Sequence, residues 1–379
     1  MTNPILPGAT LGVLGSGQLG RMFAIAARRL GYRVHVYSPD VDTPAGQVAD
    51  REFSAACDDL DQLAEFARSV DVVTFEFENV PAAVTDCIQK HCPVFPSGYV
   101  LSVAQNRIRE KSTLRDAGLV VPEFLEVNSA AELRAGVAEL GVPSVVKSAS
   151  WGYDGKGQAV IHDPDQVDEI WASLATDQAI LEQFVDFDCE LSVVGARNSQ
   201  GEFVHYGPFR NSHTNHILDV TVCPSGLPEN VNERAIATAR RVFECLDVVG
   251  VLCVELFVTK DQQILINEIA PRPHNSGHLT IDAHKTCQFE QQVRAICGLP
   301  LGDAGQHAGA AMANLLGDLW SDSEPSWQEL LACDVKLHLY GKAEARPGRK
   351  MGHITALAQS ISDADRIVRA ARSSLLNKQ

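Results

Sequence analysis

The sequence predicts a globular protein that combines a parallel α/β region with an α+β region. Two observations support this fold class: apolar runs alternate with helical patterns over about the first hundred residues, and paired apolar runs dominate the middle. The 379 residues allow two or three domains, because one domain usually takes roughly 100 to 200 residues. With 45% hydrophobic and 21% charged residues, the composition is that of an ordinary folded protein.

The N-terminal region, residues 1–105, is predicted to form a parallel sheet covered by helices. An apolar run at residues 10–14 is followed by a helical pattern over 21–30 and a second run at 33–37. A further amphipathic stretch then leads to the run at 70–77. This βαβ alternation is typical of parallel sheets.

A charged helical segment near residues 105–119 leads into the second domain, 106–298, whose pattern is α+β. Its predicted strands are residues 144–147, 158–161, 179–184, 189–194 and 202–206. A long helical pattern over 230–246 precedes two more strands, 248–258 and 263–269, separated by a polar turn. A third, smaller domain over 299–379 has a Gly- and Ala-rich run to residue 316, a run at 335–339 and a closing helix.

The net charge and the cysteine pattern exclude several classes of protein. The chain carries 32 Lys and Arg against 48 Asp and Glu, a formal charge of −16, which repels a polyanion, so we expect no nucleic-acid binding. Five Gly and two Pro interrupt the uncharged first 20 residues, so neither a signal peptide nor a membrane span fits. Ten Cys without a CxxC pair favour reduced thiols in a cytoplasmic protein.

The segment GSGQLG at residues 15–20 follows a predicted strand and opens a predicted helix. Its glycines would let backbone N–H groups approach an anion at the positive end of the helix. A dinucleotide site would also want an acid at the end of the second strand, but Tyr37 is followed by Ser38, and Asp40 lies beyond. The segment favours a phosphate of another ligand, with a structural turn and NAD as alternatives.

A second glycine-rich segment, WGYDGKG at residues 151–157, lies between two predicted strands. Its amides, with Lys147 and Lys156, could close over the phosphates of a ligand. The alternative is a solvated loop that contains a lysine by chance, because glycine also serves plain turns.

Two glutamates are predicted to face each other across a hairpin. If the turn comprises residues 260–263, Phe257 pairs with Ile266 and Glu255 pairs with Glu268. Like charges directly opposed on one sheet face are destabilising unless something neutralises them, and burial worsens the repulsion. A hard divalent cation such as Mg²⁺ resolves it and would bridge to phosphates. A one-residue register error or a shared proton are the alternatives.

The C-terminal region is locally basic in an acidic protein. Residues 334–379 contain nine Lys and Arg and four acids, and Lys342, Arg346, Arg349 and Lys350 gather around a predicted turn. This grouping favours a phosphate pocket over a solvated loop. The spacing of His274, His278 and His284 is also compatible with zinc, but the intervening Gly and Pro residues argue against it.

Several of these features occur together and in order: Lys147, the loop 152–157, Glu182-Gln-Phe-Val185, Glu255, and Asn267-Glu268 followed by APRPHNSGH at 270–278. In this order they resemble the ATP-grasp ligases. The whole chain, as far as RPGRKMGH at 346–353, resembles the 5-(carboxyamino)imidazole ribonucleotide synthetase family of purine biosynthesis. The resemblance implies an ATP-grasp fold with a Rossmann-like N-terminal domain, a lid subdomain at about 120–185 and a small C-terminal domain.

The resemblance also implies roles for individual residues. Glu255 and Glu268 would hold Mg²⁺, with Mn²⁺ as a substitute. The residues that it assigns to ATP are Arg107, Lys147, Gly152, Tyr153, Asp154, Gly155, Lys156, Gly157, Glu182, Gln183, Phe184, Val185, Glu190, His213, Asn267 and Glu268. Those that it assigns to the ribonucleotide and bicarbonate are Gln18, Leu19, Glu76, Glu78, Tyr153, Lys156, Arg272, His274, Lys342, Arg349 and Lys350. Asp154, Lys350, Arg272 and His274 are the implied catalytic residues, and the strand alternation leaves the place of Asn267 less secure.

The implied reaction joins bicarbonate to 5-aminoimidazole ribonucleotide, with ATP forming carboxyphosphate, in a cytoplasmic homodimer. Phosphorylation gives bicarbonate a leaving group, and cations stabilise charge on the transferring phosphoryl group. A formate-dependent glycinamide ribonucleotide transformylase is the nearest alternative, but its usual RPHDTG differs from RPHNSG at 272–277. An NAD-dependent dehydrogenase, an alternative of another class, would leave the two glutamates unexplained.

Overall fold

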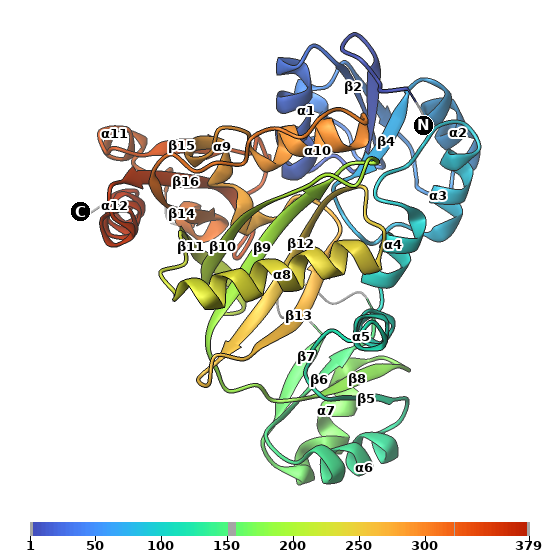
Figure 1. Cartoon of the computed structure of the whole chain (residues 1–379), viewed down its shortest axis with the longest axis vertical. Helices are drawn as coiled ribbons and strands as arrows, with labels where there is room; N and C mark the ends of the chain where they lie inside the picture. Colours follow the sequence, from blue (N-terminus) through green and yellow to red (C-terminus); the bar gives the residue numbers. More distant parts are fainter. Residues whose placement is uncertain (1–2, 151–156, 322, 377–379) are drawn as a thin grey trace.

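The structure is a computed structural model that describes residues 3–150, 157–321 and 323–376. In this part of the chain the strands form three sheets, and Figure 1 shows how they are arranged. A parallel sheet belongs to the N-terminal region, and a small antiparallel sheet lies at the opposite end of the molecule. A long antiparallel sheet lies between them. The predicted fold class, α/β combined with α+β, is confirmed.

The N-terminal sheet has the order β3-β2-β1-β4, and every pairing in it is parallel. Its strands carry side chains that are almost all buried, because helices cover both faces. The short strand β3 was not predicted, and the predicted strand 70–77 is shorter in the structure. The elements are β1 Thr10–Leu14, α1 Gln18–Arg29, β2 Arg33–Ser38, β3 Arg51–Ser54, α2 Leu60–Arg68, β4 Val72–Phe75, α3 Ala82–Gln89, α4 Gly98–Ala104 and α5 Arg107–Asp116.

The small antiparallel sheet has the order β5-β8-β6-β7 and packs against α6 and α7, which lie on its outer side in Figure 1. The side of the sheet toward the rest of the molecule approaches α5 and β13. The elements are β5 Phe124–Val127, α6 Ala130–Leu140, β6 Ser144–Ser148, β7 Gln158–Ile161, α7 Val167–Leu174 and β8 Ala179–Gln183.

The long sheet has the order β13-β12-β9-β10-β11-β14-β16-β15, so strands from the C-terminal region continue the sheet of the middle region. Helix α8 covers one face of β9 and β12, and α9 and α10 cover the other. The turn predicted among the basic residues 342–350 lies at residues 347–348, and strand β16 begins shortly after it. The elements are β9 Phe187–Arg197, β10 Phe203–Thr214, β11 Ile217–Cys223, α8 Glu229–Cys245, β12 Gly250–Thr259, β13 Ile264–Ala270, α9 Thr280–Ala283, α10 Gln288–Ile296, β14 Gly309–Leu316, α11 Trp327–Leu331, β15 Lys336–Leu339, β16 Lys350–Ala358 and α12 Ile361–Ser374.

None of the helices in the described ranges is both long and apolar enough to cross a bilayer. The edge strand β13 and the start of α5 lie where the long sheet meets the small sheet. The functional side chains described next gather at this junction and along the adjoining side of the N-terminal sheet.

Candidate active site

The two glutamates of the β12–β13 hairpin face each other. Glu255 is paired directly with Glu268, as the sequence predicts. Beyond this pair the register shifts by one residue, so Leu256 lies opposite Ile266. The predicted pairing of Phe257 with Ile266 is therefore wrong, because a β-bulge inserts one extra residue into β13.

The extra residue is Asn267, and the bulge changes the face on which its side chain lies. Strict alternation would place the side chains of Asn267 and Glu268 on opposite faces of the sheet. However, both side chains are partly exposed, while those of Ile266 and Ile269 on either side are buried. The atom Oδ1 of Asn267 is buried and has no hydrogen-bond partner. A bulge beside an active site commonly redirects a side chain in this way, so Asn267, next to Glu268 in the strand, is a candidate third oxygen ligand.

The two carboxylates of the pair differ in protonation. Burial raises the pKa of Glu255, but the charge and hydrogen bond of His274, whose Nε2 lies 2.9 Å from Glu255 Oε1, outweigh burial and lower it to about 2. Burial raises the pKa of Glu268, and the negative charge of Glu255 raises it further, against the opposing charges of Arg107 and Lys147. Glu268 is therefore the more easily protonated member of the pair.

The oxygen atoms of these three side chains suit a hard divalent cation. Two opposed carboxylates and an unpartnered amide oxygen supply the oxygen ligands that Mg²⁺ and Mn²⁺ prefer. The nearby positive charges of Arg107 and Lys147 suit the phosphates that such an ion usually accompanies.

Arg107 and Lys147 are fixed by contacts with the small sheet. The Nη1 of Arg107 donates to the carbonyl of Ser148 at 3.0 Å, and the Nζ of Lys147 lies 2.7 Å from Glu182 Oε2. Gly157 accepts a backbone hydrogen bond from Ser148 N at 2.8 Å, which anchors one end of the glycine-rich segment. Gly152, Tyr153, Asp154, Gly155 and Lys156 lie outside the described residues.

The segment 182–185, predicted to bind ATP, includes the end of strand β8. The side chain of Glu182 is buried, whereas Gln183 and Phe184 are exposed and Val185 is half-buried. Further along, His213 Nδ1 lies 2.7 Å from Glu190 Oε2 on the neighbouring strand. The structure therefore brings together these two residues, both of which the sequence resemblance assigns to ATP.

Arg272 and Glu78 join the long sheet to the N-terminal region. Nε and Nη2 of Arg272 donate to the two carboxylate oxygens of Glu78 at 2.6 and 3.1 Å. Burial raises the pKa of Glu78, but the charge and hydrogen bonds of Arg272 outweigh it and lower the pKa. Arg272 and Glu78, both predicted as site residues, thus lie together. Their bidentate contact orients the guanidinium of Arg272 beside His274 and the two opposed glutamates.

The glycine-rich segment 15–20 is built around Glu76. The backbone N–H groups of Gly17 and Gly20 donate to the Glu76 carboxylate, the latter at 2.7 Å. A Cβ on Gly15, whose φ is +97°, would lie 2.4 Å from Glu76 Cγ, and one on Gly17 would lie 2.8 Å from Glu76 Oε1. The glycines are therefore required by the close approach of this carboxylate. Gln18 and Leu19 open the same helix.

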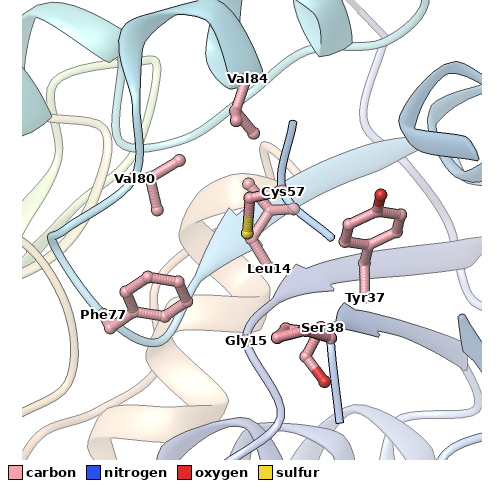
Figure 2. Close-up of a pocket in the computed structure, with 9 residues that line it drawn as sticks. Leu14, Gly15, Tyr37, Ser38, Cys57, Phe77, Val80 and Val84 are labelled. Atoms are coloured by element: carbon pink, nitrogen blue, oxygen red, sulfur yellow. The ribbon is translucent and has the colours of Figure 1, made fainter. Parts of the chain in front are cut away.

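This arrangement argues against a dinucleotide at the N-terminal sheet. Glu76 occupies the helix N-terminus that a pyrophosphate would use. The cavity at the ends of β1 and β2, shown in Figure 2, has a volume of about 30 Å³. Its lining is mainly apolar, with Leu14, Phe77, Val80 and Val84 pointing inward. No acid that could hold the ribose hydroxyls of a dinucleotide stands among the described residues that line it.

The predicted basic residues of the C-terminal region adjoin the N-terminal region. Lys342 Nζ donates to the carbonyl of Lys350, the first residue of β16, at 2.7 Å. The charge of Lys342 acts on Glu76, and that of Lys350 acts on His213. Arg349 Nη1 donates to the carbonyl of Glu344 at 2.8 Å. Lys342 and Lys350 thus lie near residues predicted for both substrates.

The three histidines weighed as zinc ligands are not brought together in the described part of the chain. His274 contacts Glu255. A different group, Asp282, His338 and His353, places one ligand atom each within 4.8 Å of one another. However, the imidazole rings of His338 and His353 are stacked, with their centroids 4.5 Å apart and their planes inclined by 11°. Because an imidazole binds a metal in its own plane, two stacked rings do not converge on one ion.

Two buried residues of α5 were not predicted from the sequence. Lys111 contacts Glu182 at 3.3 Å and donates to carbonyl groups of β13. Glu110 is buried, and burial, the largest cause, raises its pKa to about 8, although the charge of Lys111 opposes this. The helix pattern gives no sign of either role, because six of the ten residues of RIREKSTLRD are charged and nothing sets Glu110 and Lys111 apart from the rest.

Comparison with known proteins agrees with this geometry. Residues 112–289 match the ATP-grasp domain, residues 8–105 match the ribonucleotide synthetase preATP-grasp domain, and residues 310–367 match the phosphoribosylaminoimidazole carboxylase C-terminal domain. The chain is therefore an ATP-grasp enzyme of the carbon–nitrogen ligase class.

The relatives define the family more narrowly. The chain is 41% identical over 355 residues to N5-carboxyaminoimidazole ribonucleotide synthase of Bacillus subtilis (strain 168), covering 94% of this chain and 93% of that one. An N5-carboxyaminoimidazole ribonucleotide synthetase solved as an ADP complex matches with a TM-score of 0.93 and 41% identity over 98% of both chains. The Aspergillus clavatus enzyme in complex with ADP and 5-aminoimidazole ribonucleotide matches with a TM-score of 0.89 and 28% identity, over 97% of this chain and 98% of that one. The chain belongs to the N5-carboxyaminoimidazole ribonucleotide synthase family.

Proposed function

We propose that this chain carboxylates 5-aminoimidazole ribonucleotide with bicarbonate in purine biosynthesis, consuming ATP and releasing ADP and phosphate through carboxyphosphate. The observation that carries the proposal is the opposition of Glu255 and Glu268 beside Arg107 and Lys147. Family membership supplies the substrate class, because the relatives are named for this product.

In this proposal Glu255, Glu268 and Asn267 hold Mg²⁺, which would neutralise charge on the ATP phosphates when bound. Arg107 and Lys147 bind phosphate oxygens, and the backbone of 182–185 faces adenine. Glu190 and His213 contact the ribose. Arg272, oriented by Glu78, and His274, oriented by Glu255, bind bicarbonate next to the transferring phosphoryl group.

The ribonucleotide is proposed to lie between the N-terminal region and the start of β16. Lys342, Arg349 and Lys350 would hold its monophosphate together with the amides near Gln18 and Leu19. Glu76 would accept hydrogen bonds from the nucleotide. Asp154 or Lys350 would handle the amine proton, and the segment 152–157 would cover the labile intermediate.

The proposal also covers the division into domains, the oligomeric state and the cellular location. We divide the chain into domains 1–105, 106–298 and 299–379, consistent with the ranges of the family matches. We also propose that the enzyme acts as a homodimer and in the cytoplasm. The formate-using alternative is disfavoured, because the chain shares 41% identity with a carboxyaminoimidazole ribonucleotide synthase over nearly its whole length.

An assay of ADP release tests the reaction. ADP release is measured with Mg²⁺ and ATP alone, then with bicarbonate plus 5-aminoimidazole ribonucleotide, and then with formate plus glycinamide ribonucleotide. We expect stimulation by the bicarbonate pair only. Stimulation by the formate pair alone, or by neither pair, would refute the proposal.

A further inference from the structure

Lys111 is a buried cation to which the proposed reaction gives no role. Its side chain is 1% exposed, and it lies on α5, one turn after Arg107. Burying an ammonium group is costly unless hydrogen bonds and an opposite charge compensate it. The partners of Lys111 therefore indicate what the residue does.

Two of these partners are backbone carbonyls at the bulge of β13. Lys111 Nζ donates to the carbonyl of Asn267 at 2.6 Å and to that of Ile266 at 3.0 Å. A bulge interrupts the ladder of hydrogen bonds, so carbonyls there need other donors. Lys111 supplies a charged donor to the carbonyl of the bulged residue, Asn267, and to that of the residue before it.

The third partner lies on the other side of the nucleotide site. Lys111 Nζ is 3.3 Å from Oε1 of Glu182, and Oε2 of the same carboxylate is 2.7 Å from Lys147 Nζ. Glu182 and Lys147 belong to the small sheet, whereas the bulge belongs to the long sheet. Lys111 therefore links the strand that bears Asn267 and Glu268 to the lysine predicted to bind phosphate.

We propose that Lys111 is a positioning residue that holds the β13 bulge, and with it Asn267 and Glu268, in the arrangement that binds the nucleotide's divalent cation, in register with Lys147. This inference rests on the proposed cation-binding function of the carboxylate pair. Lys111 acts through these residues and not by contact with the nucleotide.

The test uses Lys111→Met, which keeps most of the length of the side chain and removes its charge and its hydrogen-bond donors. ADP affinity is measured by calorimetry with and without Mg²⁺, together with thermal unfolding. We expect the gain in ADP affinity that Mg²⁺ produces to fall by about 10-fold or more, as for other residues that orient metal ligands. The KM for 5-aminoimidazole ribonucleotide should change less than about 2-fold, because Lys111 is remote in its contacts from Lys342 and Lys350.

The matched control is Lys260→Met, which removes an exposed lysine at the turn of the same hairpin, where it pairs with Asp186. It should leave the Mg²⁺ effect unchanged. A folded Lys111→Met variant with the wild-type Mg²⁺ effect would overturn the inference. Absence of a Mg²⁺ effect in the wild type would instead refute the proposed cation site.

A second measurement applies if Lys111→Met does not fold. In a crystal structure of the wild type with Mg²⁺ and ADP, Lys111 Nζ should remain within hydrogen-bond distance of the Ile266 and Asn267 carbonyls. If Nζ has turned to a phosphate oxygen, Lys111 is a nucleotide-binding residue and the positioning role is wrong.

Discussion

His274 Nε2 lies 2.9 Å from Glu255 Oε1, and this contact makes the two opposed glutamates unequal. Glu255 keeps a firm negative charge, with a pKa lowered to about 2. Burial and the charge of Glu255 raise the pKa of Glu268. Glu268 is therefore the more easily protonated member of the pair, and a bound cation would favour its ionised form. The two substitutions to glutamine should therefore have different consequences for stability.

Glu268→Gln should abolish turnover without damaging the fold. Removing a cation ligand should lower kcat by roughly 100-fold or more, because cation stabilisation of the transition state is worth several kcal/mol. The melting temperature should stay the same or rise, since glutamine replaces a carboxyl group whose ionised form is disfavoured by burial and by the charge of Glu255. Steady-state kinetics and thermal unfolding check both parts, and unchanged turnover would remove the metal assignment.

Glu255→Gln should lose turnover and stability together. It breaks a charge-assisted hydrogen bond to His274 in which both side chains are only 15% exposed, so we expect a loss of roughly 1 to 3 kcal/mol. Urea unfolding compares this variant with Glu268→Gln. Equal stability of the two variants would contradict the asymmetry of the pair.

Gly17→Ala should disturb the N-terminal substrate region through Glu76. The new Cβ would lie 2.8 Å from Glu76 Oε1, so we expect a stability loss of about 1 to 3 kcal/mol and a higher KM for the ribonucleotide. If the contact with Glu76 is the cause, Gly17→Ala should cost less stability in a Glu76→Ala background than in the wild type. Strict additivity would show that Glu76 is not the reason for this glycine.

The pair of His213 and Glu190 should make stability depend on pH. Burial lowers the pKa of His213, but the hydrogen bond and charge of Glu190 outweigh it, so the pKa is raised. A raised folded-state pKa gives a stabilisation that is fully present below about 6.5, the unfolded value, and is lost as pH rises through the folded value. His213→Asn should therefore lower the melting temperature more at about pH 6 than at about pH 9. A difference that does not vary with pH would contradict the ion pair.

Lys350→Ala should raise the KM for the ribonucleotide by about 10-fold or more, and that for ATP by less, because a phosphate loses a charged partner. Lys336→Ala, an exposed residue of the neighbouring strand, serves as the control. Initial rates at varied concentrations of each substrate give both values, and equal effects on the two would argue against a phosphate pocket.

Local pattern was sufficient for many elements. The runs at 10–14 and 158–161 coincide with β1 and β7, because short apolar runs bounded by turns define strands directly. The opposition of Glu255 and Glu268 was predicted correctly, but the register next to the turn is one residue off, and the bulge at Asn267 restores the predicted pairing. The bulge at Asn267 was missed, although the two adjacent polar residues between Ile266 and Ile269 depart from strict alternation.

Other features depend on contacts between distant parts of the chain. Strand β16 begins within a basic segment, and its burial comes from β14 and α12. Lys111 lies in a helix rich in charged residues of both signs. Its burial becomes evident only from its contacts with Glu182 and β13. The occupation of the glycine-rich turn by Glu76 likewise requires the packing of β4 beside β1.

Crystallography with Mn²⁺ and a non-hydrolysable ATP analogue tests the cation site most directly. The anomalous signal of manganese should place one ion within about 2.0 to 2.6 Å of a carboxylate oxygen of both Glu255 and Glu268, and next to the phosphates. An ordered nucleotide whose ion lies elsewhere, with the two side chains turned apart, would contradict the account.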